Sequence, residues 1–275
     1  EQVMGSVRKN PDAMVSLAKL REYDEYTYTH CINVCVLAVA MGKHLELKKP
    51  VIRLLGLAGL FHDVGKARIP STILNKPGKL TDKEFDIMKN HPDEGYRMLS
   101  GAKKVHEQVL LGALQHHEKH NGQGYPRGLS GKGISVTAKL LALADIYDAL
   151  TSKRVYKAAM PLNKALRIMY SMRGKDFGPG EVERFVRCLG IYPVGSFVRL
   201  TDGRYGMVLK ANPDHALKPS LLMVVDEHGQ KKGNPEVLDL SKDSTEQGLS
   251  IEETADPAAF KVDPAFYLVG TSGLE

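Results

Sequence analysis

Apolar positions in the first two thirds of the chain recur at the three- and four-residue spacing of helices that bury one face. This period predicts helices, separated by Gly-, Pro- and Lys-rich loops over 67–80 and 118–134. The helical segments are 29–45, 51–66, 81–91, 105–117, 135–150, 161–173 and 179–190. Thr81 and Glu84 form a capping-box signature, which marks the start of the third helix.

The pattern changes after about residue 190. The short β-branched and aromatic runs "SFVRL", "RYGMVLKA" and "SLLMVVD" are separated by the turn sequences "TDG", "NPD" and "EHG". We therefore expect a mainly α fold with a helical domain over 1–192 and a small antiparallel β subdomain over 193–240. Residues 241–275 are rich in Ser, Thr, Asp, Glu and Pro, which predicts an acidic, partly ordered tail.

Composition narrows the classes of protein. With 275 residues, the chain is long enough for one large domain and a small appendage. No apolar run approaches the roughly 18 residues that span a bilayer, so we expect no membrane span. The net charge of +6 is dispersed, without a basic block, which argues against DNA or RNA as a partner.

The cysteines and the first residue bear on the cellular context. Three cysteines are too few for a disulfide framework, and Cys31 and Cys35 share an apolar helix face as expected of buried thiols. These features predict a reducing, cytoplasmic location. Because the chain begins at Glu1 and carries no signal-peptide pattern, we expect a fragment without its natural N-terminal region.

Several histidines and aspartates stand at helix ends or within apolar stretches. Any one histidine at a helix end is more often a cap, a surface residue or a satisfied core residue. The adjacent pairs at 62–63 and 116–117 favour a joint site, and a carboxylate within "LLALAD" is costly unless paired or bound to metal. The candidate ligands are His30, His62, Asp63, His91, His116, His117 and Asp145, with His91 expected to close a helix before Pro92.

Five imidazoles and two carboxylates exceed the about four ligands of a tetrahedral zinc site. They suit two divalent transition-metal ions with one bridging carboxylate, and the N and O donors favour Fe or Mn, with Ni or Co as alternatives. Two ions roughly 3.5–4 Å apart can share a hydroxide that attacks phosphorus. Lys66, one turn after Asp63, is placed to neutralise phosphoryl charge, although a solvated lysine at a helix end explains it equally well.

Four ordered motifs resemble the HD-GYP family, a branch of the HD metal-dependent phosphohydrolases. They are "HDVGK" (62–66), "NHPDEGYRML" (90–99), "HHEKHNGQGYP" (116–126) and "DIYDALTSKRVYK" (145–157). The resemblance spans about 20–190 and implies an HD-type helical fold. Residues 190–240 also look like a C-terminal extension seen on some members. The implied activity is hydrolysis of the bacterial second messenger cyclic di-GMP to linear pGpG, in some members onward to GMP, while some relatives prefer 3′,3′-cyclic GMP–AMP.

The resemblance also implies roles for single residues. The seven candidate ligands become metal ligands, with Asp63 bridging, and Lys66 becomes the catalytic lysine. Tyr125 lies beside the substrate, and glycines in the same loop bring the backbone close to it. The implied substrate contacts are Gly122, Gly124, Tyr125, Arg154 and Lys157.

Two departures from the family pattern leave the ligands and cations intact. Asn121 stands where the family usually has Asp, and Val155 stands where it usually has Pro. Members with a third ion carry an extra Glu near the first His. Here Glu25 is five residues before His30 and points about 140° away on a helix, so we expect two ions. His120 is expected to be solvated.

Two alternatives remain beside the phosphodiesterase. One is a catalytically weak receptor or protein-interaction adaptor, although no ligand is lost. The other is a generic HD nucleotidase, which leaves "GQGYP" and "KRVYK" unexplained. Base preference, the native metal, the role of the β subdomain, a regulatory N-terminal domain or protein partner, and a homodimer stay open.

Overall fold

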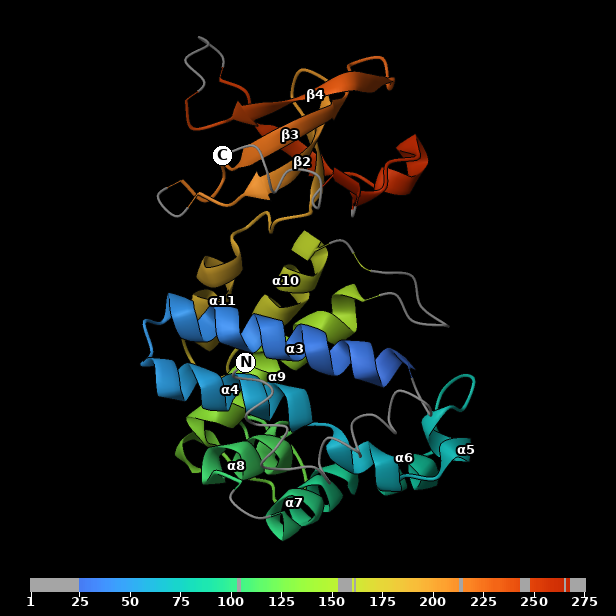
Figure 1. Cartoon of the computed structure of the whole chain (residues 1–275), viewed down its shortest axis with the longest axis vertical. Helices are drawn as coiled ribbons and strands as arrows, with labels where there is room; N and C mark the ends of the chain where they lie inside the picture. The colour runs from blue at the N-terminus through green and yellow to red at the C-terminus, as the bar shows by residue number, and fades with distance from the viewer. Residues whose placement is uncertain are drawn as a thin grey trace. The chain divides into compact units, whose positions relative to one another are not determined.

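The computed structural model describes residues 25–102, 105–152, 160, 162–212, 215–242, 248–264 and 266–267 (Figure 1). The chain divides into two compact units, Glu1–Ala159 with Met169–Val182 and Met160–Ile168 with Glu183–Glu275. Helices build the first unit, and the second contains a five-stranded antiparallel sheet. The predicted mainly α fold with a small C-terminal β subdomain is confirmed.

Most of the longer helices follow the apolar periodicity closely. They are α3 (Glu25–His44), α4 (Lys49–Phe61), η1 (Val64–Arg68), α5 (Ser71–Leu74), α6 (Asp82–Met88), α7 (His91–Gly101), α8 (Glu107–Gln115), η2 (Gly131–Gly133), α9 (Val136–Thr151), α10 (Leu162–Ser171) and α11 (Glu181–Leu189). The capping box on Thr81 is present at α6. The expectation that His91 closes a helix is wrong, because His91 opens α7 and Pro92 lies in its first turn, where no backbone N–H is needed.

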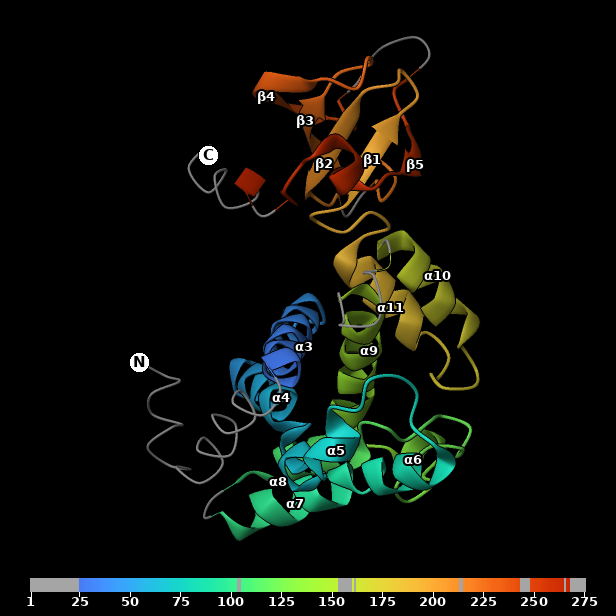
Figure 2. The ribbon, with the colours of Figure 1, turned by 90° about the vertical axis from the view of Figure 1, so that its right-hand side faces the viewer.

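The core of the first unit lies between four helices. Figures 1 and 2 show α3 and α4 running side by side, and α8 and α9 also pack on α4. Fully buried side chains fill the space, among them Val34, Ala38, Leu55, Ala58, Ala113 and Leu141. A Cβ at Gly59 would lie 2.9 Å from Cys35 Cα, so glycine lets α3 and α4 approach closely. This packing positions the C-terminal end of α4 over the middle of α3.

The second unit contains most of α10 and α11 and a sheet with strand order β4-β3-β2-β1-β5. The strands are β1 (Phe197–Leu200), β2 (Tyr205–Lys210), β3 (Ser220–Val225), β4 (Lys231–Asp239) and β5 (Ile251–Thr254), followed by η3 (Pro257–Phe260). Alternate side chains enter two apolar clusters, one around Met207 and the other around Val208. β5 lies in the segment expected to be a partly ordered tail, yet it pairs with β1, so the sheet continues past residue 240. Its sequence "IEET" carries little apolar signal.

No helix within the described part of the chain is both long enough and apolar enough to cross a membrane.

Candidate metal centre

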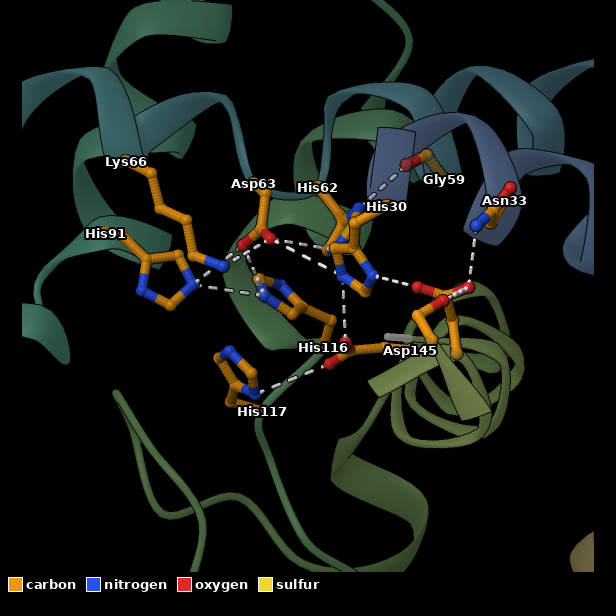
Figure 3. A network of polar contacts seen from close by, with 12 residues as sticks. His30, Asn33, Gly59, His62, Asp63, Lys66, His91, His116, His117 and Asp145 are labelled. Atoms are coloured by element: carbon orange, nitrogen blue, oxygen red, sulfur yellow. Dashed lines mark hydrogen bonds and ion pairs between the residues drawn. The ribbon is translucent and has the colours of Figure 1, made fainter. Parts of the chain in front are cut away.

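The seven candidate ligands come together in one place in the helical unit, as Figure 3 shows. They are delivered by five parts of the chain: α3, the junction of α4 with η1, the first residue of α7, the C-terminal end of α8, and α9. All are buried except His117, which is half-buried. Residues up to 115 positions apart in sequence, from His30 to Asp145, thus form a single polar cluster inside an apolar core.

Asp63 occupies the middle of this cluster and faces histidines on two sides. Its Oδ1 lies 3.2 Å from His91 Nε2 and 3.7 Å from His116 Nε2. Its Oδ2 lies 3.3 Å from His62 Nε2 and 3.7 Å from His30 Nε2. Two groups that could hold a cation therefore share this carboxylate, namely Asp63, His91, His116 and His117, and His30, His62 and Asp63.

A second carboxylate, Asp145, also reaches both groups. Its Oδ1 lies 3.1 Å from His30 Nε2, and its Oδ2 lies 3.9 Å from His117 Nδ1. Burial opposes ionisation of Asp145, but the hydrogen bond and charge of His30 hold its pKa well below the usual range. The centre therefore contains two anionic carboxylates facing imidazole nitrogens.

The ring orientation of three histidines is set by the backbone. Nδ1 of His62, His91 and His116 lies 2.7, 2.8 and 2.9 Å, respectively, from a carbonyl oxygen of the preceding turn. A carbonyl only accepts, so each Nδ1 carries a hydrogen, and a ring that binds metal would do so through a lone pair at Nε2. The Nε2 atoms of all three rings face the Asp63 carboxylate.

Convergent acceptors need a cation. His91 Nε2 and His116 Nε2 lie only 3.2 Å apart. Within the described residues, His62 Nε2 and Asp63 Oδ1 are buried without a hydrogen-bond partner. Such groups are costly in a core unless something satisfies them. A divalent ion at Nε2 and carboxylate oxygen supplies that partner, so the residues present fit a metal centre.

The fourth anchored histidine, His30, is held by Asp148, a residue that sequence reasoning missed. His30 Nδ1 lies 2.6 Å from Asp148 Oδ2, while Asn33 Nδ2 and Ser152 Oγ each donate to Asp148 Oδ1 at 2.8 Å. Burial lowers the pKa of His30, but hydrogen bonds to Asp145 and Asp148 raise it to about 9. The available signal was the three-residue spacing in "DIYDAL", which puts both aspartates on one side of α9.

Lys66, whose side chain is partly exposed, supplies a positive charge beside Asp63. Its Nζ donates to Asp63 Oδ2 at 2.5 Å. Burial disfavours the charged form of both groups, yet their attraction holds the pKa of Asp63 well below and that of Lys66 above the ordinary values. Burial also lowers the pKa of His116 to about 4 and, with the adjacent His116, lowers that of His117. Both imidazoles are therefore neutral near pH 7, the form that binds metal.

The loop after α8 folds back over the cluster. Gly122 has a φ of +79°, which glycine adopts without strain. A Cβ at Gly124 would lie 2.4 Å from Lys119 N and 2.6 Å from His117 O, so the close approach at this glycine is to the chain's own backbone. Tyr125 N donates to His117 O at 3.2 Å, and its ring centroid lies 4.7 Å from that of His117. Gly124 thereby seats Tyr125 beside the metal centre.

Glu118, which was also not predicted from the sequence, holds the C-terminal part of this loop through two hydrogen bonds. It is buried and accepts from Arg127 N at 2.7 Å and Leu129 N at 2.9 Å. Asn121 Oδ1 accepts from Gln123 N at 3.0 Å, a side-chain turn that an aspartate would also make. The expectation of a solvated His120 holds only in part, because the side chain is half-buried and its Nδ1 is buried.

Two predicted substrate contacts, Arg154 and Lys157, lie outside the described residues, as does the side chain of Glu25.

The helical fold and its histidine–aspartate cluster define a metal-binding domain, and family comparison agrees. A family model described as an HD domain matches residues 8–180, more than half of the chain, so the protein belongs to the HD domain family. A second model, a KOW domain associated with HD domain, matches residues 197–259. The family and the cluster together indicate a divalent-metal site.

Individual relatives of this chain are named as cyclic-dinucleotide phosphodiesterases. A cyclic di-GMP phosphodiesterase of Pseudomonas aeruginosa is 42% identical over 242 residues, covering 88% of this chain and 58% of the relative. A cyclic di-GMP phosphodiesterase response regulator of Xanthomonas campestris is 40% identical over 178 residues, covering 64% and 47%. A 3′3′-cGAMP-specific phosphodiesterase of Vibrio cholerae is 36% identical over 172 residues, covering 62% and 39%. The chain thus spans about half the length of these relatives, and the resemblance to the HD-GYP phosphodiesterases is confirmed.

Proposed function

We propose that this chain is the catalytic region of a metal-dependent phosphodiesterase that hydrolyses a cyclic dinucleotide to its linear form. The observation that carries the proposal is Asp63, whose two oxygens face different histidine groups while Lys66 donates to it. The names of the curated relatives support cyclic di-GMP as the substrate class, with 3′,3′-cyclic GMP–AMP as the alternative.

Two ions, Fe or Mn with Ni or Co as alternatives, fit the donor set. One would be held by His30, His62 and Asp63, and the other by Asp63 and the histidines at 91, 116 and 117, with Asp145 facing both sets. When bound, the ions lower the pKa of water and polarise the phosphodiester. Nitrogen and oxygen donors without thiolate favour these metals over Mg and Ca.

The protein's own side chains then orient the diester and screen its charge. The Lys66 ammonium, only 21% exposed and beside Asp63, would neutralise the phosphoryl oxygens as negative charge develops. Burial raises the pKa of Tyr125, so its hydroxyl keeps its proton and can donate to an oxygen of the substrate. Gly122 and Gly124 shape the loop around it. By the family motif, Arg154 and Lys157 contact guanine or phosphate.

The proposal is tested by product analysis. Protein purified without chelators is assayed for its metals and then incubated with cyclic di-GMP or 3′,3′-cyclic GMP–AMP in Mn²⁺ or Fe²⁺, with products separated by chromatography. We expect the linear dinucleotide from the native chain and none from Asp63→Ala. Binding of the dinucleotide without metal-dependent turnover would replace the enzyme by a receptor, and equal turnover of linear nucleotides would indicate a generic nucleotidase. A cytoplasmic location and a homodimer stay predictions.

A further inference from the structure

A row of aromatic rings leads from the metal centre to the surface of α6. The Tyr125 ring lies 4.7 Å from that of His117 and 6.4 Å from that of Phe85, which it meets edge-on at 81°. Phe85 stands outside the sequence motifs and outside the metal ligands. It is 44% exposed, so part of the phenyl ring is open to a ligand.

α6 presents this ring on a fixed backbone. Thr81 and Glu84 close a reciprocal capping box at its first turn. Lys76 Nζ donates to both carboxylate oxygens of Glu84, at 2.8 and 2.6 Å, which ties the preceding loop to the helix. The α6 side chains that are described include no buried residue, so the helix contributes surface rather than core. Its Phe85 is therefore an exposed and pre-oriented aromatic platform beside the loop of Tyr125.

The ring offers a flat apolar face to a planar ligand, with one cation beside it. Lys89 Nζ lies 4.8 Å from the Phe85 ring centroid, although Asp86 shares its charge at 2.8 Å. Base–aromatic stacking tolerates any base because every base has a π-face. A dinucleotide whose phosphodiester lies at the metals must place its bases outward, and Phe85 is the next ring beyond Tyr125.

We propose that Phe85 stacks against a purine base of the cyclic dinucleotide and so acts as a substrate-positioning residue. This inference rests on the proposed function and adds a base subsite on α6 to the phosphodiester site. Ile87, 40% exposed on the same helix, lies about 200° around it and faces away, which makes it a matched control.

The test is a titration of the full chain with a non-hydrolysable phosphorothioate analogue of cyclic di-GMP. Phe85→Ala should weaken binding about 5- to 30-fold, the lower part of the range for losing one base stack. Phe85→Leu should weaken binding to a similar extent, because leucine keeps the apolar bulk but has no π-face. Phe85→Trp should bind the analogue like the native chain. Ile87→Ala should also bind like the native chain. Native affinity in Phe85→Ala or in Phe85→Leu would overturn the subsite.

Hydrolysis measured on the native chain separates this inference from the proposed function. If the native chain binds the analogue but does not hydrolyse cyclic di-GMP, and Phe85→Ala binds it more weakly, the enzyme proposal fails and the base subsite stands. If the native chain hydrolyses cyclic di-GMP while Phe85→Ala binds normally, the subsite alone fails. Equal metal content and melting temperature in the native and variant chains confirm that a weakened affinity reflects the lost ring and not a damaged fold.

Discussion

At the scale of single residues, the metal centre depends on which nitrogen of each histidine carries the proton. Three rings are oriented by backbone carbonyls, which no side-chain substitution can remove. His30 is different, because its Nδ1 is held by the Asp148 carboxylate. Partners of this kind, outside the ligand set, usually change metal affinity by about 10- to 100-fold.

We therefore predict that Asp148→Asn lowers metal affinity about 10- to 100-fold and lowers phosphodiesterase activity at limiting metal. The amide keeps the shape of the side chain but removes the charge that orients His30. Metal titration checks the first effect, and recovery of activity with excess metal checks the second. The same change at Asp202, in the sheet unit, should alter neither. Native metal affinity in Asp148→Asn would show that the helix alone orients His30.

For Lys66 we predict the opposite pattern, in which substitution lowers turnover and leaves metal binding unchanged. Lys66→Met removes the ammonium beside Asp63 while keeping the length of the side chain, so metal content should stay native. Turnover should fall by about 10²- to 10³-fold, the usual effect of losing one group that stabilises transition-state charge. Metal analysis and kcat on one preparation test both statements. Loss of metal from Lys66→Met would assign the lysine to assembly of the centre.

At the scale of elements, the centre needs η1 and α7 in direct backbone contact. A Cβ at Gly65 would lie 2.0 Å from His91 O and 2.4 Å from Gly95 N, and backbone atoms cannot rotate away as side chains do. Gly65 therefore sets the distance between Asp63 on one element and His91 on the other. The glycine of "HDVGK" acts here through packing.

Gly65→Ala is expected to separate these elements and to abolish both metal binding and activity. The added methyl group would also overpack a buried backbone contact, which typically lowers the free energy of unfolding by about 1–3 kcal/mol. Gly101→Ala is the matched control, since a Cβ there meets nothing within 4 Å. Metal content and melting temperature distinguish the two variants. A fully active Gly65→Ala protein would mean that η1 and α7 can shift without disturbing the ligands.

The helices and the residues around the metal centre differ in how far the sequence predicts them. The amphipathic helices are readable because one face is continuously apolar, and the histidine pairs stand out at the ends of such helices. α7 is not predictable from Pro92 alone, because a proline can end one helix or stand in the first turn of the next, as it does here. Asp148 and Glu118 could not be recognised, since a carboxylate that serves another side chain or a loop backbone has no signature until the fold brings its partner close.

At the scale of the whole molecule, metal binding belongs to one of the two units. The candidate ligands lie in the helical unit, whose apolar cluster has no residue in common with the two clusters of the sheet unit. The HD domain and the KOW domain are likewise matched by separate family models. A metal that binds only the folded helical unit should stabilise that unit alone.

Calorimetry with and without metal tests this prediction. At a metal concentration 100 times the Kd, binding adds about 2.7 kcal/mol to the stability of the helical unit. For a unit of this size each kcal/mol raises Tm by about 2–4 °C, so addition of Mn²⁺ after EDTA should move one transition upward by about 5–10 °C. The transition of the sheet unit should not move. Asp63→Ala should show neither shift, because both groups of candidate ligands lose the carboxylate that they share. An equal upward shift of the sheet transition would contradict the prediction, because metal bound to the helical unit would then stabilise the sheet unit as well.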